Sequence, residues 1–332
     1  MQLKHPLLFS TLALCTTPVA ATTFEAPNFY GDILGQVRWE AGQDYQSEIH
    51  RANAGIKGKH DAGLLRVIYS LEAEYSEDLT QKVTEEQDFD TRVSEANLIL
   101  VTKDFGGIYF GNGTTGTYKD LYSRVDIFES NNMHRSSNAA LFRQAKSGDN
   151  QLAYMTPKWN GVYAKLAVIS PDNSNGEDID ILGLRLLYVT DNFDLVLNRA
   201  QVDEKQMPGH QDDDYVRYAL SSSYTWDNFY LGGLIELNYD DPQGDSAVYG
   251  ISGKYSLDKL TFKLGAQHKA FDDSDKDSQT LYLASLNYAF SQQFSTYVEV
   301  AEYAEDSATN DPANNNGENR NDNINIGLHF KF

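Results

Sequence analysis

Three groups of residues in this sequence have types and spacings that could carry chemistry. Residues 111–116 read GNGTTG, which fits G-x-G-x-x-G, the glycine pattern of a turn that binds dinucleotides. Histidine side chains could act as bases or metal ligands. Beyond residue 21 the histidines are His50, His60, His134, His210, His268 and His329. Runs of acids, among them the four aspartates within 272–277, could attract divalent cations.

None of these groups has the surroundings that its chemistry requires. A dinucleotide turn needs a βαβ unit and an acidic residue about 20 positions further on, and no parallel βαβ pattern occurs here. The histidines form no H-E-x-x-H, and no G-x-S-x-G nucleophile pattern is present. Acid runs of this kind are most often solvated. The sequence therefore predicts no enzymatic activity, no cofactor and no metal site.

The elements that position these residues are predicted to be β-strands, because apolar and polar residues alternate almost throughout the chain. In GDILGQVRWE (31–40), Ile33, Val37 and Trp39 share one face, while Arg38 and Glu40 point the other way. Sixteen stretches follow this pattern, at 28–41, 47–59, 63–75, 91–102, 107–113, 150–157, 161–170, 178–190, 193–204, 214–225, 229–240, 246–256, 260–271, 278–290, 294–304 and 322–332.

The connections between these strands alternate in length. Short turns such as TDN (190–192) and WDN (226–228) alternate with long polar loops such as SEDLTQKVTEEQDFD (76–90). Aromatic residues gather at strand ends, where girdles at two membrane interfaces would lie. An even number of strands with sorted loops predicts an all-β, 16-stranded antiparallel transmembrane β-barrel, closed because lipid forbids an open sheet edge. A soluble β-sandwich has no reason to sort its loops in this way.

The start of the chain and its bulk composition agree with an exported protein. Residues 1–21 have a basic start, an apolar stretch and small residues before a cut after Ala21, which is typical of a signal peptide. The remaining chain, 22–332, is then the barrel, and it lacks cysteine because Cys15 is the only one. A net charge of −21 argues against nucleic acid as a partner. No apolar run beyond the leader approaches the ~20 residues of a membrane helix.

One connection differs from the rest, and we name it the pore loop. It spans about 114–149, between the fifth and sixth strands. Tyr118, Leu121, Tyr122, Val125 and Phe128 have helical spacing there, which predicts a packed helical turn or two. A loop with its own apolar face must pack on something, and the interior of the barrel is available.

Four segments, in this order and spacing, resemble the general (non-specific) porins of Gram-negative bacteria. They are RANAGIKGK (51–59), KDFGGIYFGN (103–112), DNQLAYMTPKWNGVYAKL (149–166) and the closing GLHFKF (327–332). The resemblance covers the chain from Tyr30–Gly31 to Phe332. It implies a homotrimer of 16-stranded barrels in the outer membrane, each with its third extracellular loop folded into the pore. In this family a glycine pair ends the fifth strand, so GNGTTG is interpreted as a strand-to-loop transition rather than a nucleotide site.

The residues that would control a pore are predicted from strand parity and from this resemblance. Parity places five bases of the first four strands on the inner wall, namely Arg38, Arg51, Lys57, Arg66 and Arg92. The resemblance implies that such a wall faces acids of the pore loop, here Asp120, Asp126 and Glu129. The loop's own bases, Lys119, Arg124, Arg135 and Arg143, could pair with those acids instead.

The resemblance also implies partners and an assembly signal. The partners are outer-membrane lipid and lipopolysaccharide, the barrel-assembly machinery, and small hydrophilic solutes and ions. The machinery would read the terminal Phe332 with Phe330 and Leu328 at alternate positions before it. The expected function is that of a general diffusion porin with a weak preference for cations. A sugar- or anion-specific channel, a barrel enzyme and an adhesin are the alternatives.

Overall fold

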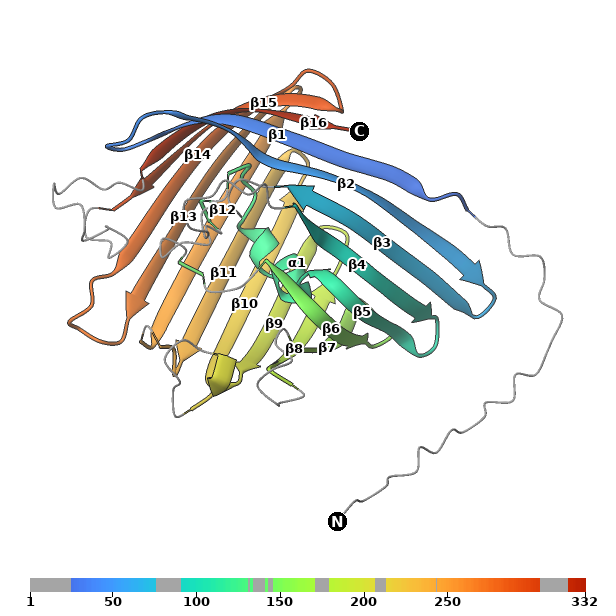
Figure 1. Ribbon diagram of the computed structural model, residues 1–332. Helices are drawn as coiled ribbons and strands as arrows, with labels where there is room; N and C mark the ends of the chain where they lie inside the picture. The colour runs from blue at the N-terminus through green and yellow to red at the C-terminus, as the bar shows by residue number, and fades with distance from the viewer. Residues whose placement is uncertain are drawn as a thin grey trace, which may run out of the picture.

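Residues 25–75, 91–130, 132–133, 141–142, 146–170, 179–206, 213–242, 244–304 and 322–332 are described by the computed structural model. Sixteen strands in these ranges form one closed antiparallel barrel (Figure 1). Each strand pairs with its neighbours along the chain, and β1 closes the ring against β16, from Asp32 opposite Lys331 to Glu40 opposite Asn323. The 16-stranded antiparallel barrel predicted from the sequence is thereby confirmed.

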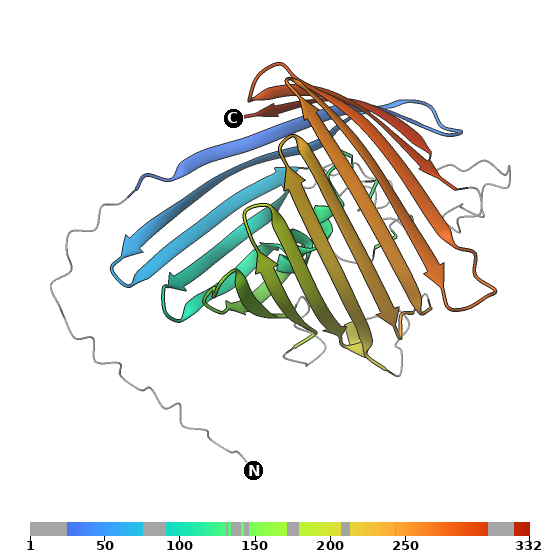
Figure 2. The ribbon, with the colours of Figure 1, turned by 180° about the vertical axis from the view of Figure 1, so that it is seen from behind.

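The strands are β1 Asn28–Glu40, β2 Gln46–Ala62, β3 Leu65–Tyr75, β4 Thr91–Thr102, β5 Gly106–Thr114, β6 Ser147–Met155, β7 Val162–Ile169, β8 Ile181–Val189, β9 Phe193–Val202, β10 Tyr215–Trp226, β11 Phe229–Tyr239, β12 Ser246–Leu257, β13 Leu260–Phe271, β14 Gln279–Ala289, β15 Phe294–Tyr303 and β16 Asn323–Lys331. Figure 2 shows the long, tilted strands of the opposite side of the barrel.

The alternation of residue types determines which face of each strand meets water. In β16, Ile324, Ile326 and Leu328 are exposed on the outside, whereas Asn323 and Asn325 are buried toward the interior. This apolar-outside, polar-inside pattern is the reverse of a soluble barrel and is that of a barrel surrounded by lipid. The helical elements of the described chain are short, and none is long and apolar enough to cross a membrane.

Turn chemistry accounts for the tight ends of several hairpins. Asp227 and Asp258 have positive φ angles of 47° and 51°, each in a two-residue turn between paired strands. Aspartate tolerates this left-handed conformation better than most residues. The long loops at 76–90 and 171–178, and the expected signal peptide at 1–21, lie outside the described residues.

The fifth and sixth strands differ in detail from the prediction. The sixth was expected at 150–157 but runs from Ser147 to Met155. A bulge lets Gly113 pair with Gly148 and so lengthens the strand at its start. Pro157 has no amide hydrogen for the ladder, which is consistent with the earlier end. The predicted glycine transition falls at this bulge: a Cβ on Gly111 would lie 2.2 Å from the carbonyl oxygen of Ala96.

Candidate functional site: the barrel interior

The pore loop lies inside the barrel, where Figure 1 shows its short helix α1 (Gly116–Asp120). The side chain of Thr115 caps this helix by accepting a hydrogen bond from the Tyr118 amide at 3.1 Å. A 3-10 turn, η2 (Tyr122–Arg124), follows. The helical turns predicted from the apolar spacing are therefore present.

The apolar face of the pore loop is buried against one side of the barrel. Leu121, Tyr122 and Val125 are at most 1% exposed. They belong to one cluster with inward-facing side chains of the strands, including Leu187, Val196, Leu234, Val248, Leu281 and Leu283. We call the inner face of β7–β15 the packed wall. Removing this apolar area from water stabilises the folded loop against the barrel.

Backbone carbonyls of the pore loop are held by hydroxyl groups of the packed wall. Ser221 donates to the carbonyl of Leu121 at 3.1 Å, and Tyr230 donates to that of Arg124 at 2.8 Å. Strand β11 also has Gly232 at the contact, where a Cβ would lie 1.9 Å from the Arg124 carbonyl oxygen. Only glycine allows the loop backbone to approach the strand so closely.

A buried polar group fixes the centre of the loop. The Tyr122 hydroxyl donates to a carboxylate oxygen of Glu236. Arg217 lies 3.9 Å from the same carboxylate, measured from Nε to Oε2, and 5.9 Å from the centre of the Tyr122 ring. Burial and the neighbouring carboxylate raise the pKa of Tyr122, so the phenol keeps the proton that it donates.

The three acids predicted for the constriction are engaged elsewhere. Asp120 binds Lys165 Nζ through both oxygens at 2.8 Å and lies 3.4 Å from Arg185. Glu129 binds Lys263 at 2.6 Å. These bases belong to the packed wall, and among the described residues neither acid forms an ion pair with the predicted arginine wall, Lys119 or Arg124. Arg135 and Arg143 lie outside the described residues. Asp126 accepts a hydrogen bond from the Tyr118 hydroxyl at 2.5 Å.

Residues 129–132, near the middle of the loop in sequence, are attached to β15 and β16. Glu299 accepts hydrogen bonds from the Glu129 amide at 3.1 Å and from the Ser130 hydroxyl. Asn132 exchanges amide hydrogen bonds with Asn323 at 3.1 and 2.8 Å. The loop is thus held to the barrel at several points between Asp120 and Asn132.

The inner face of β1–β5, which we call the open wall, carries most of the predicted bases. Arg51 forms a two-point ion pair with Asp32, at 3.0 and 3.4 Å. Arg38 is buried, 3.3 Å from Glu40.

The other three predicted bases have different surroundings. Arg92 lies 3.6 Å from Glu74 and donates to Ser147 at 3.3 Å. Lys57 lies 4.4 Å from the centre of the Tyr30 ring. Arg66 lies at the exposed start of β3, paired with Asp61 at 2.6 Å.

Strand parity did not lead to two wall carboxylates, Glu72 and Glu95, that the structure brings together with the loop base Lys119. Glu72 and Glu95 are direct cross-strand partners on β3 and β4. Lys119 of α1 reaches Glu95 with a 3.3 Å distance between Nζ and Oε1. The same strand parity that selected Arg66 and Arg92 could have found Glu72, but a bulge between Glu72 and Ala73 shifts the register in this region.

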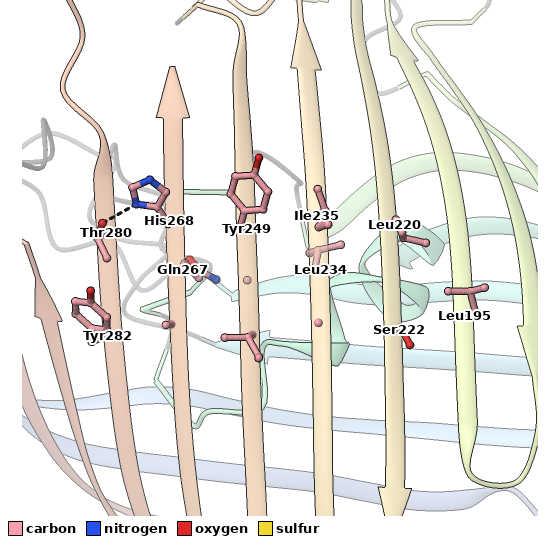
Figure 3. Close-up of a pocket in the computed structure, with 14 residues that line it drawn as sticks. Leu195, Leu220, Ser222, Leu234, Ile235, Tyr249, Gln267, His268, Thr280 and Tyr282 are labelled. Carbon is pink, nitrogen blue, oxygen red and sulfur yellow. Dashed lines mark hydrogen bonds between the residues drawn. The ribbon is translucent and has the colours of Figure 1, made fainter. Parts of the chain in front are cut away.

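A hollow of about 710 Å³ lies on the outer surface of β9–β14. In Figure 3 Tyr249, Tyr282 and His268 stand on one side of the sheet, with the pore loop behind it. His268 Nδ1 and Thr280 Oγ1 are 2.8 Å apart at its margin. Because its lining is otherwise mostly apolar and faces outward, this hollow belongs to the lipid-facing surface and not to the passage through the barrel.

The predicted assembly residues lie together on the outside of the last strand. Leu328, Phe330 and Phe332 are all exposed at alternate positions. The Phe332 backbone closes the ring by exchanging hydrogen bonds with Gly31 at 3.0 and 3.1 Å. Among the described residues, no three His, Cys, Asp or Glu side chains gather in a way that could hold a metal ion.

Comparisons with known proteins agree with this architecture. An anion-selective porin from Comamonas acidovorans aligns with a TM-score of 0.72 and 17% identity, covering 92% of this chain and 99% of that one. OmpF of Salmonella typhi, solved with daunomycin, gives 0.71 and 15%, covering 92% and 97%. The trimer form of OmpT, an outer membrane protein of Vibrio cholerae, gives 0.69 and 13%, covering 92% and 99%. No curated protein matches the sequence significantly.

At these identities the structural matches establish the fold alone, and the family rests on the sequence. A family profile described as Gram-negative porin matches residues 10–309, which is most of the chain. Fold and family together indicate a channel rather than an enzyme. The chain belongs to the Gram-negative porin family, and its location is the bacterial outer membrane.

Proposed function

We propose that this protein is a general diffusion porin that lets ions and small hydrophilic solutes pass passively, with a weak preference for cations. The observation that carries the proposal is the asymmetry of the interior. The pore loop packs on one wall through an apolar cluster, while the opposite wall presents partly exposed charged side chains such as Arg51 and Glu95. A polar face beside a fixed loop suits a passage that selects by size and charge.

The preference for cations is supported by charge. The chain carries a net charge of −21, and its field favours cations near the channel entrances. The bases of the open wall are largely matched by carboxylates, as in the pair of Arg51 with Asp32. Pairing reduces the ability of these bases to attract anions.

The test is electrical and osmotic. The purified protein is reconstituted in a planar bilayer under a KCl gradient, and neutral sugars of increasing size are tested by liposome swelling. We expect ohmic conductance steps, a reversal potential that favours K⁺, and swelling rates that fall smoothly with sugar size. A reversal potential favouring Cl⁻ would contradict the cation preference. Rapid uptake of one sugar class alone would indicate a substrate-specific channel.

We also propose that the protein is a homotrimer and, separately, that the barrel-assembly machinery recognises its C-terminal residues. The trimer form of the similar Vibrio cholerae protein supports the assembly state, and the exposed Phe332, Phe330 and Leu328 suit recognition by the barrel-assembly machinery. Conductance should close in thirds if the trimer is the functional unit. Deletion of Phe332 should lower the amount of folded barrel in the outer membrane, whereas Lys331→Gln should not. We further propose that the outer surface of the barrel contacts outer-membrane lipid and lipopolysaccharide.

A further inference from the structure

Two of the three acids predicted for the constriction, Asp120 and Glu129, are poorly placed to attract a passing ion. Asp120 is only 8% exposed and is neutralised by Lys165 and Arg185. Glu129 is neutralised by Lys263, whose side chain is 8% exposed. An ion pair presents little net charge beyond its immediate surroundings. These two acids are therefore weak candidates for the charge that acts on ions.

Two carboxylates on the open wall form a pair that packing does not explain. Glu72 and Glu95 lie directly opposite each other on β3 and β4, an arrangement of like charges that destabilises a sheet. The structure supports them with neutral donors: Ser94 donates to Glu72 at 2.6 Å, and Ser70 donates to Glu95 at 2.9 Å. Among the described residues no base forms an ion pair with Glu72. We call Glu72 and Glu95 the wall dyad.

The pore loop contributes a cation, not an acid, toward this dyad. Lys119 lies on the exposed side of α1, with 53% of its side chain accessible, and its ammonium group is 3.3 Å from a Glu95 oxygen. At this contact a loop base faces a wall acid, whereas the resemblance implies loop acids that face wall bases. A tethered ammonium group occupies part of the position that a mobile cation would favour.

We propose that the wall dyad sets the ion preference of the channel and that Lys119 limits it. Glu72 contributes a carboxylate that forms no ion pair with a base in the described part of the chain, and Glu95 contributes one that Lys119 partly neutralises. Removing an acid of the dyad weakens the attraction for cations, and removing Lys119 strengthens it. This inference deepens the proposed porin function and rests on it.

The experiment measures the K⁺/Cl⁻ permeability ratio from reversal potentials at about 0.1 M KCl, where charges act over about 10 Å. Glu72→Gln should lower the ratio roughly twofold to threefold, the size expected for one charge acting across several ångströms of water. Lys119→Gln should raise it by a similar factor. The double variant Glu95→Gln/Lys119→Gln should return close to wild type, because it removes one charge of each sign.

Matched controls change the same charges outside the passage. Asp258→Asn and Lys259→Gln alter the β12–β13 turn, and asparagine accepts the positive φ of residue 258. Both should leave the ratio unchanged. Glu129→Gln should change it less than Glu72→Gln. Migration of the folded barrel before and after heating identifies variants that fail to fold.

The outcomes separate this inference from the proposed function. If the wild-type protein showed no conductance, the proposed channel function would be contradicted. The role of the dyad would be overturned if conductance were normal and neither Glu72→Gln nor Lys119→Gln changed the K⁺/Cl⁻ permeability ratio. If Glu129→Gln changed the K⁺/Cl⁻ permeability ratio more than Glu72→Gln did, selectivity would be assigned to the pore loop instead.

Discussion

The packed wall and the open wall of this barrel use similar charged side chains in different surroundings. On the packed wall, Lys165, Arg185 and Lys263 bind acids of the pore loop and serve as attachment points. On the open wall, Arg51 and Glu95 stay partly exposed, and their partners are mostly other wall residues. The difference shows that charges covered by the loop attach it to the barrel, and it is the basis of our proposal that the charges left partly exposed act on passing ions.

The largest expected effect comes from detaching the pore loop from the packed wall. Tyr122→Ala removes a fully buried ring that contacts Phe142, together with the hydroxyl group that donates to Glu236. We expect a loss of about 3–5 kcal/mol in the free energy of unfolding, typical of truncating a buried aromatic residue. Guanidinium chloride titration of the refolded barrel measures the loss, and single-channel recordings should become noisier.

Tyr122→Phe is the matched control for that change. It keeps the ring but removes the hydroxyl, leaving Glu236 without this donor, so it should cost only about 1–3 kcal/mol. Equal losses for the two variants would mean that the hydrogen bond, and not the packing, holds the loop.

A smaller effect is expected from breaking the loop's first ion-pair group. Asp120→Asn leaves Lys165 and Arg185 without their carboxylate in a mostly buried position. Removing one partner of a buried pair is costly, and we expect up to about 3 kcal/mol of destabilisation because the amide retains a hydrogen-bond acceptor. The same titration measures it. A variant as stable as wild type would show that the apolar cluster alone fixes the loop.

On the open wall, a comparable change should alter ion preference more than stability. Arg51→Gln frees the Asp32 carboxylate and should raise the K⁺/Cl⁻ permeability ratio about twofold. Asp32→Asn should move the ratio in the opposite direction. Reversal potentials under a KCl gradient measure both. Shifts of the same sign in the two variants would contradict a direct electrostatic role for this pair.

The smallest effect is expected at Arg66, although it was predicted to belong to the same basic wall. Its pair with Asp61 is exposed at the end of the hairpin. Exposed ion pairs contribute little to stability and are screened by salt. Arg66→Gln should therefore leave unfolding and reversal potential unchanged. A shift as large as that of Arg51→Gln would extend the selective region to the end of the barrel.

The fold could be predicted almost completely because apolar and polar residues alternate along each strand. This alternation is required when one face of the strand meets lipid and the other meets water. The apolar spacing of Tyr118, Leu121, Tyr122 and Val125 was likewise enough to predict a packed loop. Strand ends were less certain, since a bulge at Gly111–Gly113 lengthens β6 beyond its alternating segment.

The pairing of charges could not be predicted to the same degree. Parity tells which residues face inward but not which of sixteen strands lies opposite a loop acid. Asp120 therefore meets Lys165 of β7 and Arg185 of β8, and not the bases of β1–β4. Lys119 reaches Glu95 because α1 directly follows β5, and β5 pairs with β4, the strand that carries Glu95.

The most direct test of the difference between the open wall and the packed wall uses single introduced cysteines. The background is clean because the chain's one native cysteine, Cys15, lies in the expected signal peptide. Glu72→Cys places a thiol on the open wall, and Val248→Cys places one at an inward position with 0% exposure beneath the pore loop. A positively charged, water-soluble thiol reagent is then added to conducting channels. We predict that conductance falls for Glu72→Cys and stays unchanged for Val248→Cys. Equal reaction at both positions would contradict the account, because it would show that water reaches the wall on which the loop is packed.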